Sequence, residues 1–397
     1  MITVEEALKI VLTHTTDFGT ESVPLDQAYG RILREPIVAD RDFPPYDRVT
    51  MDGIAIKFEE FKGGRRDFHI EGTAAAGEEQ KTLNDSKSCL EVMTGSVMPA
   101  NADTVIRYED IVIENDVASI REDAITYRQN IHFKGEDRKQ GDIVIHPGKR
   151  ISSSEVGVCA TVGSSNVQVA RLPRTIIIST GDELVDIDEK PQAHQIRRSN
   201  VYRLSTVLRH YHIPVTTAHL MDDKELIKSE LEKYVNEYEL LILSGGVSKG
   251  KFDFLPEALE MAGVKKLFHK IKQRPGKPFW FGVHPHATVF AFPGNPVSSF
   301  MCMQQYFISW LNRSLGENDK PVPRAVLTEE VTFKPDLTYF LEVAVDYGKD
   351  GTIRATPVKG NGSGDLANLV DAEAFIVLPM GRDTFAEGEV FPLLFYR

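Results

Sequence analysis

Polar residues suited to binding an anion follow three short apolar runs that are typical of buried strands. TIIIS is followed by TGDE (180–183), ELLIL by SGGVS (244–248), and TVFAF by PGNP (293–296) and then Ser298. Glycine in such loops lets backbone N–H groups approach an anion with no Cβ in the way. A single loop of this kind is an ordinary turn. Three loops at the same edge of one sheet predict a ligand cleft.

Positive charge and carboxylates lie close to these loops in the sequence. The stretch KIKQRPGKPFWFG carries Arg274 and Lys277 around a Pro-Gly turn. Glu183, Asp222 and Asp253 supply hard carboxylate oxygens of the kind that Mg²⁺ accepts. Anion donors, cations and carboxylates together favour a phosphorylated ligand held with a divalent metal. Asp222 directly precedes a predicted helix, so capping of that helix is an equally good interpretation of this residue.

Alternating strands and helices between 174 and 316 would position these loops. TIIIST, IPVTTAHL, ELLIL and TVFAF are expected strands, and they alternate with expected helices at SNVYRLSTVLRHY, DKELIKSELEKYVNEY, FLPEALEMAG and residues 297–315. This alternation predicts a doubly wound, mostly parallel sheet with helices on both faces. Ligands in such α/β sheets bind outside the carboxyl ends of the strands, where the polar loops are expected.

The rest of the chain reads differently. Residues 3–14 fit a short amphipathic helix that Thr3 and Glu6 can cap. From about 50 to 170, short β-type runs alternate with Gly, Asn and Asp clusters, and five short strands after Pro321 predict a small β-barrel or sandwich. These patterns predict an α/β multidomain protein in which β-rich segments lie on both sides of the α/β domain in the sequence.

Composition narrows the class of protein. The formal net charge of −12 argues against non-specific nucleic-acid binding, which depends on phosphate neutralisation by Lys and Arg. The three cysteines are scattered and suit a reducing compartment. No apolar run approaches the length of a membrane span, and the N-terminus has no apolar signal core. We expect a cytoplasmic protein with no nucleic-acid partner and no membrane segment.

A second group of polar residues lies outside the predicted sheet. FPPYDRVTMDGIAI (43–56) contains Asp52, and EVMTGSVMPANADTVI (91–106) contains Thr94. The turn chemistry of a hairpin explains these residues without a functional role.

Seven motifs in this order resemble the molybdopterin molybdotransferase family, which includes the E domain of gephyrin. They are PPYDRVTMDGIA, MTGSVMPANADTVI, ISTGDELV, RRSNVYRL, LSGGVSKGKFDF, RPGKPFWFG and FPGNPVSSF. The likeness runs from about residue 3 to the C-terminus. It implies an elongated homodimer of four-part subunits with an α/β domain of the molybdopterin-binding type. The four parts are an N-terminal linking domain (1–50 with 136–172), a β-rich inserted domain (51–135), the α/β domain (173–317) and a C-terminal β-barrel domain (318–397). It also implies an enzyme that inserts molybdenum from molybdate into adenylylated molybdopterin, with Mg²⁺, and releases AMP.

The resemblance also implies roles for residues that match the family motifs. Catalytic roles fall to Asp52, Thr94, Glu183, Asp222 and Asp253. Binding of molybdopterin and its phosphate falls to Ser244, Gly245, Gly246, Ser248, Lys270, Pro293, Gly294, Asn295 and Pro296. Molybdate binding falls to Arg274, Lys277 and Ser298, and Mg²⁺ binding to Glu183 and Asp253. The family fold places the motifs of Asp52 and Thr94 from one subunit against the cleft of the other.

Two departures and two alternatives accompany this resemblance. Arg274 stands where lysine is commoner, and Glu342 falls near where many members carry an arginine proposed to help hold molybdate. One alternative is adenylyl transfer to molybdopterin, which a related, smaller and usually trimeric domain performs. The other is a non-catalytic scaffold, because gephyrin also binds a partner protein. The four-part chain and the MDG motif favour the molybdotransferase, with a molybdopterin adenylyltransferase as a further expected partner.

Overall fold

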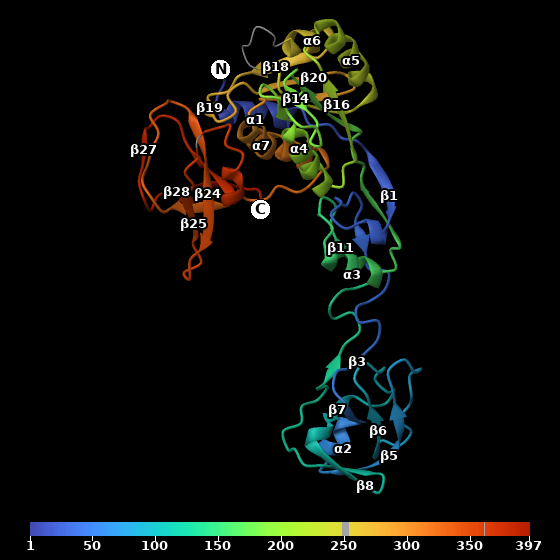
Figure 1. Cartoon of the computed structure of the whole chain (residues 1–397). Coiled ribbons are helices and arrows are strands. Elements are labelled where there is room, and N and C mark those ends of the chain that lie inside the picture. The colour runs from blue at the N-terminus through green and yellow to red at the C-terminus, as the bar shows by residue number, and fades with distance from the viewer. Residues whose placement is uncertain (248–253, 361) are drawn as a thin grey trace.

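The computed structural model describes residues 1–247, 254–360 and 362–397. Ser248 and Asp253, which the sequence singles out as candidate site residues, lie outside the described residues. Figure 1 shows an elongated chain with an α/β body, a C-terminal β domain on one side of it, and a second β domain at the far end of a narrow connection.

The α/β body is built on a mostly parallel sheet, as predicted. Its strand order is β16-β13-β17-β21-β20-β18, in which β16, β13, β17 and β21 are parallel and β20 pairs antiparallel with both β21 and β18. The strands are β13 (Thr175–Thr180), β16 (Val215–Leu220), β17 (Leu240–Ser244), β18 (Lys265–His269), β20 (Trp280–Val283) and β21 (Thr288–Phe292). The carboxyl ends of β13, β17 and β21 therefore lie side by side at one edge, where the polar loops follow.

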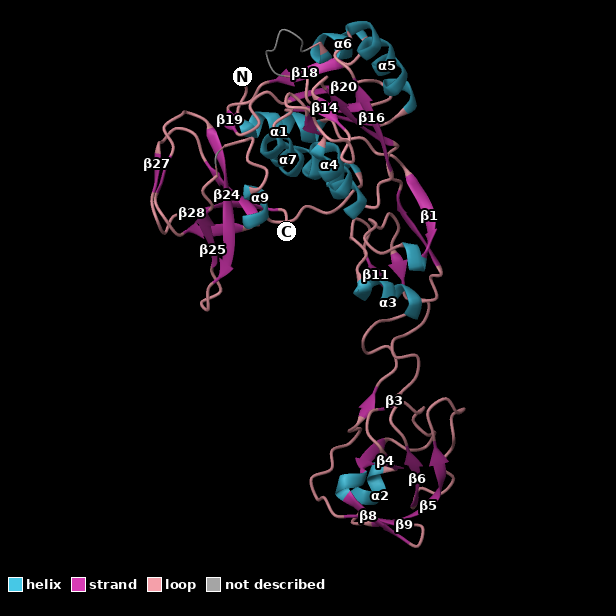
Figure 2. Cartoon of the chain, viewed as in Figure 1, coloured by secondary structure: helices cyan, strands magenta, loops and turns pink. Residues whose placement is uncertain are grey.

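Helices cover both faces of this sheet, because successive side chains of each strand point to opposite faces. Ile177 packs in a core with α1, α4, α7, η3 and α8, whereas Ile176 and Ile178 pack in a core with α5 and α6. The helices are α1 (Val4–Thr13), α4 (Ser199–His210), α5 (Lys224–Glu237), α6 (Leu255–Met261), α7 (Pro296–Cys302) and α8 (Ile308–Ser314). Figure 2 shows them gathered around the sheet.

Two details of these helices bear on the predictions. The capping box at the start of α1 is present as expected, because the Thr3 hydroxyl accepts from the Glu6 backbone and the Glu6 carboxylate accepts from the Thr3 backbone. The long helix expected over 297–315 is interrupted by a π-helical turn, η3 (Met303–Phe307).

Among the described residues, no helix combines the length and apolarity needed to cross a membrane.

The domain at the far end of the connection is β-rich. Its sheet has the order β7-β4-β6-β5-β9-β8. Its elements are β4 (Gly53–Ile56), α2 (Phe58–Lys62), β5 (Asp67–Ala74), β6 (Ser88–Val92), β7 (Thr104–Arg107), η2 (Tyr108–Asp110), β8 (Ile111–Glu114) and β9 (Val117–Ile120). The chain enters it through β3 (Arg48–Val49) and leaves through β10 (Ile131–His132), and these two strands pair antiparallel.

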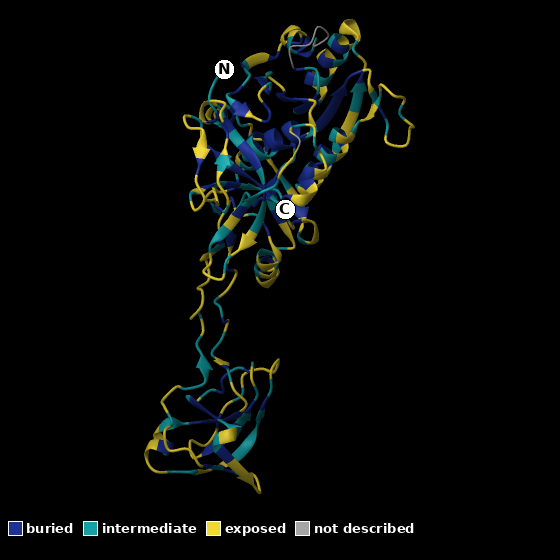
Figure 3. Cartoon of the chain, turned by 60° about the vertical axis from the view of Figure 1, so that its left-hand side comes forward, coloured by how far each residue is buried: buried dark blue, intermediate teal, exposed yellow. Residues whose placement is uncertain are grey.

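A small linking region joins that domain to the α/β body. It pairs β1 (Thr20–Pro24) with β12 (Asn166–Ala170) and β2 (Ile37–Val38) with β11 (Ile143–Ile145), beside η1 (Leu25–Gln27) and α3 (Ser153–Thr161). Figure 3 shows that the narrow connection between this region and the inserted domain is mostly exposed or half-buried, whereas each domain has buried strands.

The C-terminal domain is a closed β-barrel. Its strands pair in the order β24-β25-β22-β28-β26, and pairing of β24 with β26 closes the ring. The elements are β22 (Arg324–Leu327), β23 (Val331–Thr332), β24 (Thr338–Tyr347), β25 (Ile353–Pro357), α9 (Asn368–Asp371), β26 (Ala374–Leu378), β27 (Thr384–Phe385) and β28 (Val390–Phe395). A short strand of the α/β body, β19 (Gln273–Arg274), pairs with β24 and so ties the two domains together.

Candidate active site

A cleft of about 820 Å³ opens at the carboxyl ends of β13, β17 and β21. The structure brings most of the predicted binding residues together there. The residues of the prediction that line the cleft are Glu183, Asp222, Ser244, Gly245, Gly246, Pro293, Gly294, Asn295 and Pro296. Lys270, in contrast, lines neither this cleft nor the cavity beside it.

The paired glycines after β17 are required by close packing and by backbone conformation. Gly245 and Gly246 have φ angles of +106° and +67°, which L side chains rarely adopt. A Cβ on Gly245 would lie 2.9 Å from the Thr180 carbonyl oxygen, and one on Gly246 would lie 2.5 Å from Leu255 Cδ1. The buried Thr180 hydroxyl has no hydrogen-bond partner among the described residues, so this polar loop has donor capacity left for a ligand.

Asn200 and Arg203, to which the sequence analysis gave no role, hold two of the loops in place. The Asn200 side-chain amide donates to Ser244 Oγ at 2.9 Å and to the Gly294 carbonyl oxygen at 2.7 Å. Arg203 donates to Asn200 Oδ1 at 3.0 Å and to the Pro296 carbonyl oxygen. Burial lowers the pKa of Arg203 to about 10. Asn200 and Arg203 are three residues apart on α4 and so lie on one face of the helix. This spacing was the signal in the sequence that could have found them.

One carboxylate near the start of α5 caps that helix, and others line the cleft. Asp223 caps α5, because its carboxylate accepts from Leu226 N at 2.8 Å. Capping by Asp222 is therefore wrong, and Asp222 lines the cleft instead, with its backbone N–H donating to Asp182 at 2.9 Å. Glu183 is exposed, and its carboxylate lies against Gly181. A Cβ added to Gly181 would lie 2.4 Å from Glu183 Oε2.

These carboxylates fit a magnesium ion that also binds a phosphate. Among the described residues, no three His, Cys, Asp or Glu side chains form a metal cage. Glu183 and Asp222 nevertheless line the same cleft with hard oxygen atoms. Mg²⁺ is usually held by one or two carboxylates together with substrate phosphates and water, so this donor set suits it.

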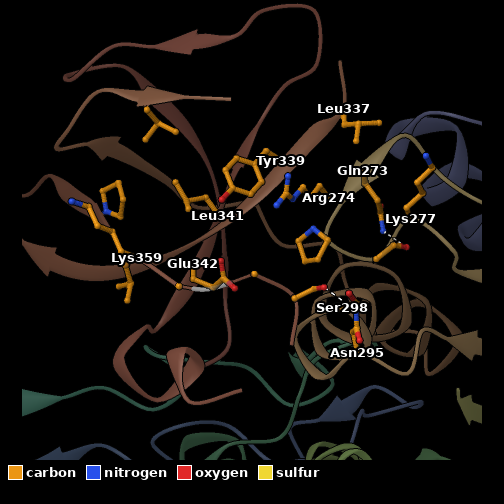
Figure 4. Close-up of a pocket in the computed structure, with 18 of the residues that line it drawn as sticks. Gln273, Arg274, Lys277, Asn295, Ser298, Leu337, Tyr339, Leu341, Glu342 and Lys359 are labelled. Atoms are coloured by element: carbon orange, nitrogen blue, oxygen red, sulfur yellow. Dashed lines mark hydrogen bonds between the residues drawn. The ribbon is translucent and has the colours of Figure 1, made fainter. Parts of the chain in front are cut away.

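A cavity of about 720 Å³ adjoins the cleft, between the α/β body and the barrel, and shares Pro278, Pro293 and Asn295 with it. The predicted molybdate ligands Arg274, Lys277 and Ser298 all line it, and Lys359 adds a further cation (Figure 4). Within residues 1–247, 254–360 and 362–397, Arg274, Lys277 and Lys359 make no ion pair. Unpaired cations in a shared cavity favour binding of a multivalent oxyanion. We call this cavity the oxyanion pocket.

The loop that carries Arg274 and Lys277 is fixed by a residue that the sequence analysis missed. Gln273 is fully buried; its side-chain amide donates to the Gly276 carbonyl oxygen at 3.0 Å and accepts from the Tyr306 hydroxyl. The same residue pairs with the barrel, since Gln273 lies opposite Thr338 in the β19–β24 ladder. The cations are therefore positioned by both domains at once.

Asp52 and Thr94 meet each other, but not the cleft of their own chain. Thr94 donates its backbone N–H and its hydroxyl to Asp52 Oδ1, and both residues are exposed. The bond from the Thr94 backbone N–H, and to a smaller extent the bond from its hydroxyl, lower the pKa of Asp52. The inserted domain that carries them lies far from the α/β body (Figure 1), and neither residue lines the cleft or the oxyanion pocket.

Comparison with protein-family models accounts for nearly the whole chain. The MoeA N-terminal region (domain I and II) matches residues 2–163, a probable molybdopterin binding domain matches residues 176–313, and the MoeA C-terminal region (domain IV) matches residues 324–396.

Individual proteins are similar over their full length. A molybdopterin molybdenumtransferase of Synechocystis sp. is 42% identical over 396 residues, which is 99% of each protein. One of Staphylococcus epidermidis is 30% identical over 400 residues, with 99% of this chain and 95% of that protein covered. A solved structure of the molybdopterin biosynthesis moeA protein of Pyrococcus horikoshii OT3 superposes with a TM-score of 0.85 at 27% identity and covers 100% of both chains.

Proposed function

The chain belongs to the MoeA family, and from that premise we propose that it inserts molybdenum from molybdate into adenylylated molybdopterin and releases AMP. It is a transferase of molybdenum cofactor biosynthesis. The observation that carries the proposed reaction is the adjacency of a glycine-lined cleft and a pocket whose cations form no ion pair with any described residue. The two spaces share Pro278, Pro293 and Asn295.

The two spaces suit the two substrates. The loop of Ser244, Gly245 and Gly246 offers donors to the pterin phosphate and adenylate, together with the Thr180 hydroxyl, which bonds to no residue that the structure describes. Arg274, Lys277 and Ser298 offer positive charge and a hydroxyl to molybdate in the neighbouring pocket. No covalent protein nucleophile is required. The protein contributes by placing the reactants together and by stabilising charge as AMP leaves.

Glu183 and Asp253 hold Mg²⁺ on the adenylate phosphate in this proposal, with Asp222 at the same cleft. When bound, the ion neutralises charge on the phosphate oxygens. Asp253 lies outside the described residues, so the support for its role is the resemblance of its motif. Asp253→Asn tests the role, because asparagine caps a helix about as well as aspartate but is a poorer Mg²⁺ ligand. We expect AMP release to fall by orders of magnitude with little change in melting temperature.

We further propose a cytoplasmic homodimer in which Asp52 and Thr94 of each subunit complete the cleft of its partner. Support comes from their exposed, hydrogen-bonded pair at the far end of an elongated chain (Figure 1). A molybdopterin adenylyltransferase is the expected protein partner, since its product is the substrate proposed here.

The experiment that tests this function measures AMP release from adenylylated molybdopterin with and without molybdate. We expect release that depends on molybdate and saturates with it. Release at the same rate without molybdate would contradict molybdenum insertion. Failure to release AMP under either condition, with the protein folded and Mg²⁺ present, would leave the scaffold alternative.

A further inference from the structure

A half-buried carboxyl group faces the oxyanion pocket from the barrel side. Glu342 lies on β24 and lines the pocket together with Arg274, Lys277 and Ser298. In Figure 4 its carboxyl group is directed from the barrel toward the space that Arg274 and Ser298 border. A negative charge at this place would oppose the binding of any oxyanion, so the protonation state of Glu342 decides how the pocket works.

No group in the described part of the chain neutralises a Glu342 carboxylate. Among the described residues, no other residue donates a hydrogen bond to its side chain, and none of the pocket cations forms an ion pair with it. Burying an ionised carboxylate without donors is strongly unfavourable, whereas the neutral acid is tolerated. The position therefore makes Glu342 easier to protonate than an exposed glutamate.

The charged and titratable neighbours act in the same direction. Burial raises the pKa of Glu342, the Asp365 carboxylate near α9 raises it further, and only the residue's own backbone N–H opposes them. Tyr339 on the same strand and Tyr396 after β28 are neutral phenols whose pKa values burial also raises. The cations of the pocket are Arg274 on β19, Lys277 in the loop that follows, and Lys359 after β25, and the exposed carboxylates at its rim are Glu329 and Glu330.

We propose that Glu342 acts as a carboxylic acid that donates its O–H to an oxygen of the tetrahedral oxyanion bound by Arg274 and Lys277. This inference rests on the proposed function and names a further binding residue for its oxyanion substrate. Every oxygen of a fully ionised tetrahedral oxyanion is a hydrogen-bond acceptor, so a protonated carboxyl complements it and a carboxylate repels it. Where Glu342 is ionised in the free protein, binding of the anion takes up one proton from solvent. This proton forms the O–H bond of Glu342, and no other covalent bond changes.

Proton uptake makes the affinity for the oxyanion depend on pH. The bound anion stabilises the acid form, so the pKa of Glu342 is higher in the complex than in the free protein. Affinity is strongest below the pKa of the free protein and falls as pH rises toward the pKa of the complex. Linkage sets the slope at up to about tenfold in affinity per pH unit where one proton is taken up.

Isothermal titration calorimetry of the full chain with molybdate alone measures the affinity for the anion and the proton uptake on binding. Titrations in buffers of different ionisation enthalpy, at about pH 6, 7 and 8, give the affinity and the number of protons taken up. The informative variant is Glu342→Gln, because the amide is nearly the same shape and donates an N–H at every pH. Glu330→Gln is the matched control, since it removes a carboxylate from the exposed rim of the same pocket. Melting temperatures check that both variants fold.

We expect the wild type and Glu330→Gln to take up a substantial fraction of a proton and to lose up to about 100-fold in affinity from about pH 6 to about pH 8. Glu342→Gln should take up less, with a flatter pH profile. Equal proton uptake by Glu342→Gln and the wild type would overturn the inference. An affinity that rises with pH would also overturn it, because it indicates that binding releases protons instead of taking them up.

Molybdate-dependent AMP release by the same proteins separates this inference from the proposed function. If the wild type releases AMP and binds molybdate with proton uptake that Glu342→Gln does not alter, the role of Glu342 is wrong and the proposed function stands. If the wild type neither binds molybdate nor releases AMP, the role of Glu342 and the proposed function are both wrong.

Discussion

Thr94 donates both its backbone N–H and its hydroxyl to the same carboxylate oxygen of Asp52, at 2.6 Å and 2.8 Å. Both bonds favour the ionised carboxyl and lower the pKa of Asp52. We predict that Thr94→Val raises this pKa toward its ordinary value, because valine keeps the N–H and loses the hydroxyl. Thr94→Ser, which keeps both donors, is the control. An NMR titration of the Asp52 carboxyl carbon measures the shift, and an unchanged midpoint in Thr94→Val would contradict the prediction.

Mixed dimers test whether the proposed site is shared between subunits. Asp52→Ala and Glu183→Ala chains should each be inactive alone. After subunit exchange, an equal mixture should recover about a quarter of the wild-type AMP release, because half of the dimers are mixed and each of these has one complete site. Exchange is checked with differently tagged chains. No recovery despite mixed dimers would place Asp52 and Glu183 in the site of one subunit.

Lys277 should matter for molybdate, because it lines the oxyanion pocket and makes no ion pair among the described residues. Loss of a charge-assisted hydrogen bond is worth about 1.5–3 kcal/mol, so Lys277→Ala should raise the half-saturating molybdate concentration by about 10- to 100-fold. Arg274→Lys should be mild, since the charge is kept. Lys272→Ala is the control from the same stretch, because Lys272 lines neither the pocket nor the cleft. An unchanged molybdate dependence in Lys277→Ala would remove this residue from the site.

Asn200 should matter for both stability and turnover. Its amide joins the end of β17 to the loop after β21, through Ser244 and Gly294. Asn200→Ala removes these bonds and one acceptor of Arg203, so we predict a loss of about 1–3 kcal/mol in the free energy of unfolding. AMP release should also slow, because two binding loops lose their common support. Thr206→Ala, on the exposed side of the same helix, should change neither quantity. Wild-type turnover in Asn200→Ala would show that the loops hold their position without this bridge.

The ion pair of Arg150 and Glu317 should make stability depend on pH. Burial would raise the pKa of Glu317, but hydrogen bonds from Arg150 and Lys320 outweigh burial and lower it. A pKa that is lower in the folded state gives a stabilisation that is present above the ordinary value of 4.5 and is lost as pH falls through the folded-state pKa.

Glu317→Gln should therefore lower the free energy of unfolding by about 1.5–3 kcal/mol at neutral pH. The difference from the wild type should shrink at acidic pH. Urea unfolding of both proteins at neutral and at acidic pH measures this difference in the free energy of unfolding. Glu257→Gln, which removes the exposed pair with Lys224, should have a small effect at either pH. A deficit in Glu317→Gln that stays constant with pH would show that packing, not charge, stabilises this contact.

Much of the fold was predictable because its signals are local. The runs TIIIS, ELLIL and TVFAF are apolar throughout and end at glycine or proline, which marks both the buried strands and their ends. Their loops meet because parallel strands share an edge, and that rule needs no knowledge of side-chain contacts. The capping box of Thr3 and Glu6 was predictable for the same reason, since it involves residues three apart.

The rest depends on contacts between distant segments. Gln273 gives no sign in the sequence that it will be buried against Tyr306 and paired with the barrel. Asp222 and Asp223 are adjacent and chemically identical, so only the backbone conformation at the start of α5 decides which of them caps the helix. Pattern reasoning also could not place Lys270 outside the cleft, because a basic stretch shows charge but not direction.

The antiparallel pairing of β3 with β10 has a consequence for how this chain can evolve. Arg48 lies opposite His132 and Val49 opposite Ile131, so the segment between them begins and ends at nearly the same point in space. The hydrophobic clusters of the inserted domain draw only on residues from 49 to 131. A gene could therefore lose, exchange or lengthen this segment without disturbing the cores on either side. The fold thus permits this domain to change in sequence and length while the domains that carry it stay unchanged, and the proposed shared site limits that freedom at Asp52 and Thr94.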